Sequence, residues 1–511
     1  MKQVFKPLGI AAAVATASAG YVNVANAQEV ANNALGDLAL VPYYTVNGNW
    51  ITGIHIVNTS DQTQVVKMRF RRAADSLDAL DFNVVLSPQD VYAGFLSDDA
   101  NGDISWEAND TTCTVPAASG GKLTMPSIYR DGAETGYVEI IGMGAPTTET
   151  APIAIAAKHV AGVPADCTAV RSNFFADGTS VADFGVNDPA TTWQAAGTAV
   201  KAGGANSYGD TGDVLKVSYF IRDNDSGVEF GDNAVHIQGF LDRPSMTNQE
   251  FGWLSGDLDG FDFPNLDGTT PSTKAGYVPQ RDRFADLRDP SVLGVGKLIN
   301  EWTANEANGA ALSWVVTMPG QYTMMDTPQF VLALQDAADG PDASDVTCTR
   351  ANGCDYRDIP VEVSLAAYDR EEDTPDPISG DLTVSPALPG ERTITTLTKE
   401  VNVVTFGGNE VLGVSDRDIN AGLSQPFGWL ELSVSSQADA SSPDPRACNW
   451  DYTQDQTGGP QAPDSVLLAL NTSCDSVGGN VPMIGFAAWA RNVAANPDAS
   501  YGRIVAHSFS S

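Results

Sequence analysis

The amino-acid sequence predicts an all-β chain: a multi-domain, antiparallel β-sandwich-like architecture with little helix, stapled by disulfides. Short runs rich in valine, isoleucine, tyrosine and phenylalanine recur along the chain, and some alternate apolar and polar residues, which is typical of half-buried strands. Clusters of glycine, proline, asparagine and aspartate separate these runs, as turns do in sandwiches and barrels. The cysteines number six, and an even count suits a disulfide framework.

The first two strands are expected at 38–46 and 50–57. Asn47-Gly48 lies between them, and Asn-Gly between two such runs is the strongest short signal for a β-hairpin. The remaining strands are expected, in chain order, at 65–70, 80–86, 91–96, 136–141, 153–160, 215–222, 234–241, 313–318, 361–368, 401–406, 428–435, 466–470 and 483–490.

Helix is expected in one segment, 284–303, where Pro290, Gly294 and Gly296 weaken the prediction. Two shifts in composition suggest domain boundaries: 195–212 is rich in glycine and alanine, and 369–377 is rich in aspartate, glutamate and proline. The predicted units are therefore a signal peptide at 1–27, an N-terminal β-sandwich-like domain at 28–205, a middle β-rich domain at 206–378 and a C-terminal β-rich domain at 379–511.

The first 27 residues have the pattern of a cleavable secretory signal. Lys2 and Lys6 precede an apolar stretch at 8–19, and Ala25-Asn26-Ala27 is an A-x-A cleavage signal. The apolar stretch is too short for a transmembrane helix, and no second hydrophobic segment follows. We therefore expect a secreted protein at the cell surface with no transmembrane insertion.

Cysteine usage agrees with an oxidising location. Pairing each cysteine with its neighbour in sequence would keep every bridge within one third of the chain, although the sequence leaves the pairing open. Zinc is the competing interpretation, but no C-x-x-C motif is present and no histidine lies near the cysteines. The predicted neighbour bridges are Cys113 with Cys167, Cys348 with Cys354, and Cys448 with Cys474.

Charge restricts the possible partners. The chain has 28 lysines and arginines against 64 aspartates and glutamates, a formal net charge of −36. Such a field repels phosphate backbones, so nucleic-acid binding is excluded, whereas cations are attracted. Because only 18% of the residues are charged, the imbalance reflects scarce basic residues rather than acidic tracts.

Catalytic motifs are absent from the sequence. No H-E-x-x-H, G-x-S-x-G, P-loop or G-x-G-x-x-G pattern occurs, so we expect no enzyme. The four histidines lie in apolar or alternating runs, where a half-buried strand position accounts for them. A glycosidase carboxylate pair remains open as an alternative, because its separation is spatial and not sequential.

Oxygen ligands accumulate in three acidic loops, 98–103, 223–229 and 257–267. Calcium takes six to eight hard oxygens, and a tight loop with acids at alternate positions can supply several. None of the three is a complete EF-hand loop, and ordinary Asp/Asn/Gly turns are the alternative interpretation. The candidate calcium ligands are Asp99, Asn101, Asp103, Asp223, Asp225, Glu229, Asp257, Asp259 and Asp262.

Six phrases spread along the mature chain carry a resemblance to known proteins. They are Leu40-Val41-Pro42-Tyr43-Tyr44, Ile56-Val57-Asn58-Thr59-Ser60, Leu80-Asp81-Phe82-Asn83-Val84, Leu86-Ser87-Pro88-Gln89-Asp90-Val91, Ser313-Trp314-Val315-Val316-Thr317 and Val404-Thr405-Phe406-Gly407-Gly408. Together they resemble a family of exported cell-surface proteins of Gram-negative proteobacteria. The size, acidity and signal are similar to those of its members that form surface layers (S-layers) in marine species. The resemblance implies self-assembly into a lattice over the outer membrane, and it assigns no functional residue.

We therefore expect a structural protein that binds copies of itself in a surface-layer lattice, with calcium bridging acidic contacts. Divalent ions would join it to outer-membrane surface glycans or lipopolysaccharide. Two alternatives remain: an adhesin or filament subunit linked by strand exchange, and a secreted carbohydrate-active hydrolase. The nine tryptophans are dispersed, which favours core positions over a stripe of sugar-stacking rings.

Overall fold

The computed structural model describes most of the chain after residue 27 in several segments. The predicted signal peptide, 1–27, lies outside the described residues. The described residues are 28–172, 198–199, 207–241, 284–320, 361–370, 393–434, 449–453, 468–473, 481–491 and 500–510, apart from 75, 77, 100, 126–129, 131, 285, 305–309, 398 and 420–425.

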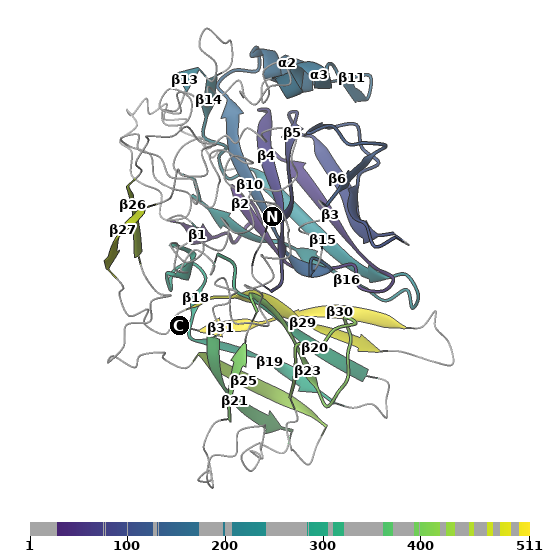
Figure 1. Cartoon of the computed structure of the whole chain (residues 1–511), viewed down its shortest axis with the longest axis vertical. Coiled ribbons are helices and arrows are strands. Elements are labelled where there is room, and N and C mark those ends of the chain that lie inside the picture. Colours follow the sequence, from purple (N-terminus) through teal and green to yellow (C-terminus); the bar gives the residue numbers. More distant parts are fainter. Residues whose placement is uncertain are drawn as a thin grey trace, which may run out of the picture.

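The all-β prediction is confirmed, and the described strands build two β-sandwiches, one above the other in Figure 1. The first sheet has nine strands in the order β1-β17-β2-β10-β4-β5-β8, and β14 adds to β10 and carries β13. Its strands are β1 (Glu29–Val30), β2 (Leu38–Thr45), β4 (Gln64–Arg72), β5 (Asp78–Leu86), β8 (Cys113–Val115), β10 (Thr135–Pro146), β13 (Thr198–Ala199), β14 (Ser207–Gly209) and β17 (Val235–Gln238).

The second sheet completes the first sandwich. Its order is β16-β15-β3-β6-β7-β9, and each described pair in it is antiparallel. Its strands are β3 (Trp50–Asn58), β6 (Val91–Asp98), β7 (Ile104–Glu107), β9 (Lys122–Thr124), β15 (Leu215–Asp223) and β16 (Glu229–Asn233).

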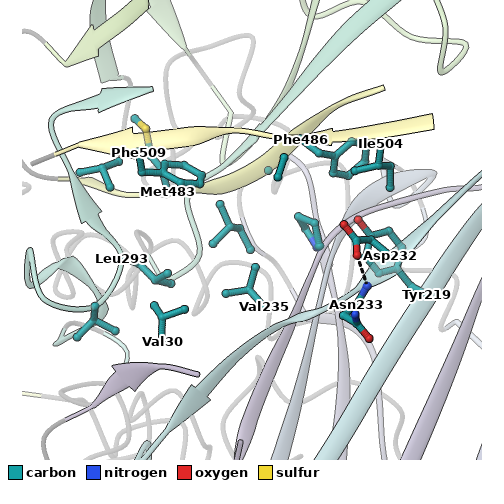
Figure 2. A pocket seen from close by; sticks show the side chains of 16 residues that line it. Val30, Tyr219, Asp232, Asn233, Val235, Leu293, Met483, Phe486, Ile504 and Phe509 are labelled. Carbon is teal, nitrogen blue, oxygen red and sulfur yellow. Dashed lines mark hydrogen bonds between the residues drawn. The ribbon is translucent and has the colours of Figure 1, made fainter. Parts of the chain in front are cut away.

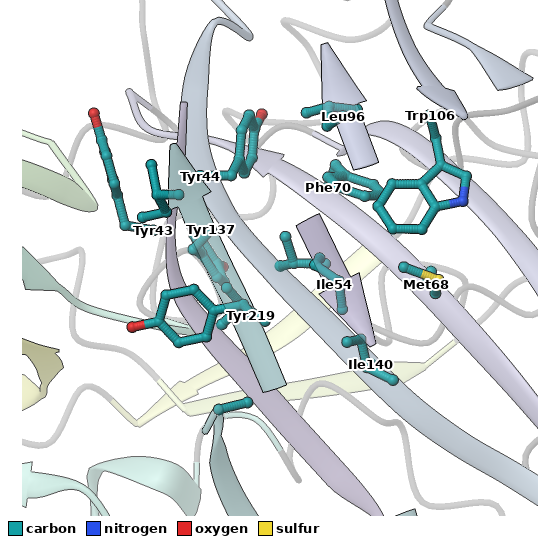
Figure 3. Close-up of a cluster of buried hydrophobic side chains, with 14 of the residues drawn as sticks. Tyr43, Tyr44, Ile54, Met68, Phe70, Leu96, Trp106, Tyr137, Ile140 and Tyr219 are labelled. Atoms are coloured by element: carbon teal, nitrogen blue, oxygen red, sulfur yellow. The ribbon is translucent and has the colours of Figure 1, made fainter. Parts of the chain in front are cut away.

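The core of the first sandwich is built by strand alternation (Figure 3). Met68 and Phe70 of β4 point between the sheets and meet Ile54 of β3, and all three are fully buried. Trp106 of β7 belongs to the same cluster, with its ring centroid 5.6 Å from that of Phe70, and its indole N–H donates to the Tyr92 hydroxyl at 2.8 Å. Burial of side chains of this size supplies the main driving force for the sandwich.

The opposite face of the first sheet is also buried. At one end, apolar side chains of β4 and β10 pack beneath two short helices, α2 (Pro152–Ala157) and α3 (Cys167–Ser172). At the other end of this face lie Lys67, Arg69 and Arg71, whose side chains are fully buried. This sheet therefore has two buried faces, and one of them carries charge.

The second sandwich consists of a third sheet, β22-β21-β25-β19-β31, and a fourth, β24-β23-β20-β29-β30. Among the described pairs of these two sheets, β23 with β24 is the parallel one. The strands are β19 (Lys297–Thr303), β20 (Ala310–Thr317), β21 (Val361–Asp369), β22 (Thr393–Leu397), β23 (Val401–Phe406), β24 (Arg417–Ile419), β25 (Phe427–Val434), β29 (Ile484–Arg491), β30 (Tyr501–Ala506) and β31 (Ser508–Ser510).

Smaller elements surround the two sandwiches. A 3-10 turn, η2 (Asp286–Arg288), precedes β18, and no helix in the described part of the chain is long and apolar enough to cross a membrane. The short strand pairs are β11 (His159–Val160) with β12 (Val163–Pro164), β18 (Gly294–Val295) with β28 (Val481–Pro482), and β26 (Asn449–Thr453) with β27 (Leu468–Ser473).

The fourth sheet joins the two sandwiches because its two faces belong to different cores. Val315 and Val403 pack in the core of the first sandwich, whereas their neighbours Trp314 and Val404 pack in the core of the second. Hydrogen bonds reinforce the joint: the Thr317 hydroxyl donates to a backbone carbonyl of β2 at 2.5 Å, and the backbone N–H of Val401 donates to the backbone carbonyl of Ala73 at 3.0 Å. The two sandwiches therefore form one continuous body.

The connections differ from the expected hairpin. Gly48 adopts a positive φ of 62° in a tight turn, yet β2 lies in the first sheet and β3 in the second. The link between β5 and β6 crosses between the sheets in the same way. The hairpin prediction at Asn47-Gly48 was therefore wrong, because both flanking strands bury apolar side chains in the space between two sheets.

Two predictions of local structure were also wrong. The segment 153–160 forms helix α2 for most of its length, since proline opens it and the following alanines favour helix. The segment 284–303 forms η2 and then strands β18 and β19. In β19 buried and half-buried positions alternate, so the period of two outweighs the weak helical propensity.

Strand pairing divides the chain differently from the predicted boundaries near 205 and 378. β15 pairs with β3 and β17 pairs with β2, so 215–238 belongs to the first sandwich. β19 and β21 both pair with β25 in the second sandwich. The described strands of 206–378 thus complete the sheets of both neighbours, which a boundary drawn from local composition does not detect.

Candidate functional site

The first acidic loop closes the hairpin between β6 and β7. The Asp99 carboxylate accepts hydrogen bonds from the backbone N–H groups of Asn101 at 2.8 Å and Asp103 at 3.1 Å. These bonds lower the pKa of Asp99, because they favour its charged form. Asp103 forms an ion pair with Arg130. The Asp99 carboxylate therefore closes the turn itself, and the Asp103 carboxylate is engaged by Arg130.

The second acidic loop closes the hairpin between β15 and β16 in a similar way. The Asp223 carboxylate accepts from the backbone N–H groups of Asp225 at 3.0 Å and Ser226 at 3.1 Å. Asn49 donates to the Asp225 carboxylate at 2.6 Å, and Glu229 lies 3.8 Å from a nitrogen of Arg222. This loop is therefore fastened to the turn between β2 and β3.

Calcium is not assigned to either loop by this geometry. In the described residues no group of three or more histidines, cysteines, aspartates or glutamates is arranged to hold a metal ion. The outward oxygens of the two loops remain available for contacts beyond the molecule. The third predicted group, Asp257, Asp259 and Asp262, lies outside the described residues.

The disulfide between Cys113 and Cys167 is confirmed, with a Cα–Cα distance of 5.3 Å. It joins β8 of the first sheet to the start of α3. The remaining predicted partners, Cys348, Cys354, Cys448 and Cys474, lie outside the described residues. This bridge fixes the helical cover of the first sheet.

A polar cavity of about 230 Å³ lies beside this disulfide. Its wall includes the aromatic rings of Tyr92 and Trp106, the carboxylate of Asp110 and the guanidinium of Arg171. Nε of Arg171 donates to the Thr114 carbonyl at 2.8 Å, and burial lowers the pKa of Arg171. No carboxylate of the described residues lies within 4.0 Å of this guanidinium, so a partly desolvated cation faces a cavity lined by hydroxyl groups.

Next to the cavity, His159 joins three side chains. Its Nδ1 lies 3.1 Å from the Ser87 hydroxyl and 3.5 Å from the Asp90 carboxylate, and its Nε2 lies 3.4 Å from the Thr111 hydroxyl. A catalytic serine and its orienting aspartate contact opposite nitrogens of the imidazole. Here Ser87 and Asp90 share one nitrogen, so the cluster ties the β5–β6 link to β11 and lacks the geometry of a triad.

A pair of carboxyl groups lies at the end of β17. Asp37 is 3% exposed and accepts from the backbone N–H groups of Phe240 at 2.9 Å and Leu241 at 2.7 Å. Burial, with the neighbouring charge of Asp213, raises the pKa of Asp37 to about 7. Asp213 also has a raised pKa through burial and accepts from Gly239 at 3.1 Å. These acids hold the chain at 239–241.

An apolar pocket of about 240 Å³ lies between the two sandwiches (Figure 2). Val235 and Leu293 form one side, and Met483 and Phe486 form the other. Asp232 and Asn233 lie at its edge. The pocket exists because the two sandwiches pack together, since its walls come from strands of both halves.

Comparison with protein-family models, with curated proteins and with solved structures finds no match for this chain. The arguments about function therefore rest on the residues described above.

Sequence reasoning missed the polar cavity, the Asp37–Asp213 pair and the apolar pocket. For the cavity a signal was present: Asp110-Thr111-Thr112 directly precedes Cys113, and Arg171 follows Cys167 by four residues. The predicted bridge between the two cysteines already places these groups near each other. The other two sites combine residues that no local pattern connects.

Proposed function

We propose that the chain is an exported structural protein of the cell surface, which assembles laterally with its own copies into a surface-layer lattice over an outer membrane. The observation that carries the proposal is the shared fourth sheet, whose two faces complete two cores. A lattice needs subunits that keep a fixed shape, and a hinge between sandwiches would let neighbouring contacts drift. Continuous cores remove that hinge.

Charge supports a role for calcium between the subunits. At −36, identical copies repel one another unless cations neutralise the facing carboxylates. The two acidic hairpin turns lie at the surface, with Asp99 fully exposed and Asp225 exposed. We infer that calcium bridges such turns of neighbouring copies, where oxygens from two chains together supply enough ligands.

Attachment to the envelope is the second part of the proposal. The polar cavity combines aromatic rings, hydroxyl groups and the guanidinium of Arg171, which suits an acidic sugar of an outer-membrane glycan or lipopolysaccharide. Divalent ions provide the other route. Retention of the Arg171→Gln protein on lipopolysaccharide vesicles, with and without a chelator, separates the two routes. Arg222→Gln, at an exposed ion pair, is the matched control.

The experiment that tests lattice formation is negative-stain electron microscopy of the purified mature chain, residues 28–511, in millimolar calcium and then in a chelator. Ordered sheets that form with calcium and dissolve with the chelator are expected. Sheets in both conditions would remove the role of calcium. Filaments would favour a filament subunit, and single particles in both conditions would overturn the lattice.

A further inference from the structure

A small apolar projection caps the far end of the first sandwich (Figure 1). It consists of α2 and the β11–β12 hairpin. Ile155 is 56% exposed, Val160 is 60% exposed and Val163 is 50% exposed. The opposite side of α2 is buried against the first sheet, so the projection is firmly seated and its outer side is without cover in the described part of the chain. We call Ile155, Lys158, Val160 and Val163 the apical knob.

The apical knob carries one cation. Lys158 ends α2 and is exposed, and no carboxylate of the described residues lies within 4.0 Å of its ammonium group. Basic residues are scarce in this chain, 28 against 64 acids. A lysine placed among exposed apolar side chains, without an acid beside it, suits an acidic partner surface.

The pocket between the two sandwiches has the apolar lining that an apolar side chain of a second copy requires (Figure 2). Its walls are mainly apolar, and two side chains at its opening, Val30 and Phe509, are 43% and 42% exposed. Its volume is about 240 Å³, and a cavity of about 150 Å³ already holds a benzene ring. Branched aliphatic side chains such as Ile155 therefore fit within it.

The opening of the pocket carries the opposite charge. Asp232 is exposed there and accepts from the backbone N–H of Asn233 at 2.7 Å. No cationic group of the described residues lies within 4.0 Å of its carboxylate. An apolar knob with a cation and an apolar pocket with an anion thus lie on different surfaces of the same molecule.

We propose that the apical knob of one copy inserts into the pocket between the sandwiches of the next copy, and that Lys158 pairs with Asp232 across this contact. The inference rests on the proposed lateral assembly and names one of its contacts. Because knob and pocket are different surfaces, the contact is heterologous: repeated from copy to copy, it builds an open row of subunits unless the rotation between copies closes a ring. Apolar burial supplies affinity, and the ion pair sets the register.

The test is a charge exchange at the contact. Lys158→Glu and Asp232→Lys, made singly in the mature chain, should each raise the protein concentration needed for half of it to sediment as assemblies by about tenfold. The double variant should recover assembly, because the pair is restored in reverse. Ile155→Asp should abolish assembly, whereas Val91→Asp, at a 49% exposed position elsewhere, should not.

Each result decides between the two proposals. Native protein that stays monomeric at every concentration overturns both. Native protein that assembles, with Ile155→Asp and Lys158→Glu assembling equally well, overturns the knob-and-pocket contact and leaves the lattice intact. Loss of assembly in all variants, including the double exchange, also overturns the contact. Unchanged melting curves establish that the exposed substitutions leave the fold intact.

Discussion

The two sandwiches share one architecture and differ in buried charge: among the described residues, both have exposed ion pairs, and the first also has ion pairs that are fully buried. In the first, Lys67 lies 3.3 Å from Asp81 and Arg71 lies 3.1 Å from Glu139, and all four side chains have zero exposure. In the second, each described ion pair leaves its cation at least 32% exposed. These ions of the first sheet are buried because helices cover one end of that face and a residue of the second half, Glu400, reaches the other.

The buried charges of the first sandwich lie where the two halves of the molecule depend on each other. Arg71 donates to the Ser76 carbonyl at 2.9 Å, and the Ser76 hydroxyl donates to the Glu400 carboxylate. Glu400 precedes β23 of the shared sheet. The buried charges therefore link the first sheet to the second sandwich. Because such charges are costly without their partners, they favour one docking geometry over others.

The largest expected effect comes from breaking the buried charges. Glu139→Gln removes a carboxylate that contacts Arg71 at 3.1 Å and Arg69 at 3.7 Å. Both guanidinium groups stay buried with less compensation, so the free energy of unfolding should fall by about 3–5 kcal/mol. Urea denaturation followed by tryptophan fluorescence measures it. A loss below about 1 kcal/mol would mean that these charges are solvated in solution.

The next largest effect should be a pH dependence of the free energy of unfolding that comes from Asp37 of the first sandwich. The pKa of Asp37 is raised from 3.8 to about 7, so between these values the folded chain binds more protons than the unfolded chain. Stability from this group is therefore full below pH 4 and is lost as the pH rises to 7, by about 4 kcal/mol at most. Denaturation of native and Asp37→Asn protein across this range should differ in slope, and parallel curves would contradict the assignment.

Two buried histidines give stability the opposite pH dependence: they lower it as the pH falls. Burial lowers the pKa of His507 and of His236 from 6.5 to about 4. Between pH 6.5 and 4 the unfolded chain binds more protons, so this stability is lost as the pH falls through that window. His507→Asn should flatten the acid limb of the curve by up to about 3 kcal/mol. An unchanged acid limb would show that His507 is charged in the folded chain.

Loss of the disulfide should give an effect of similar size that is confined to the first sandwich. Replacing both Cys113 and Cys167 by alanine opens a loop whose ends are 54 residues apart. The free energy of unfolding should fall by about 2–4 kcal/mol. Hydrogen exchange should become faster in α3 and β8 while β20 and β25 keep their protection. Equal loss of protection in both sandwiches would contradict a local role.

The smallest effect is expected at an exposed ion pair of the second sandwich. Arg503 lies 2.7 Å from Glu301, and both side chains are more than two fifths exposed. Glu301→Gln should cost less than about 1 kcal/mol, which also makes it the matched control for Glu139→Gln. If the two substitutions cost the same, burial would not explain the difference between the sandwiches.

Sequence alone predicted much of the fold and little of its assembly. The alternation of apolar and basic residues identifies β4 as a strand, since the apolar Val66, Met68 and Phe70 take every second position. The same alternation suggests a solvated face for Lys67 and Arg69, and the structure buries both. The second face of a sheet is covered by residues far away in the chain. A local pattern of apolar and polar residues carries no information about them.

The candidate sites show the same difference between features set by nearby residues and features set by distant ones. The bridge between Cys113 and Cys167 followed from sequence proximity, and the acidic loops at 98–103 and 223–229 form turns between strands, which was the alternative interpretation of these loops. The segment 153–160, which carries most of the apical knob, was predicted as a strand, because its alanine-rich helix is only six residues long. The pocket proposed to receive the knob of a second copy needs strands from both sandwiches, and the predicted domain boundaries separated those strands.

Lattice formation by a rigid, two-sandwich subunit is tested most directly by electron microscopy of the mature chain beside its Lys158→Glu variant, both in millimolar calcium. At a protein concentration just above that at which the native chain assembles, our account predicts ordered arrays of the native chain and dispersed particles of constant shape for the variant. Dispersed particles for both proteins at every concentration would contradict it.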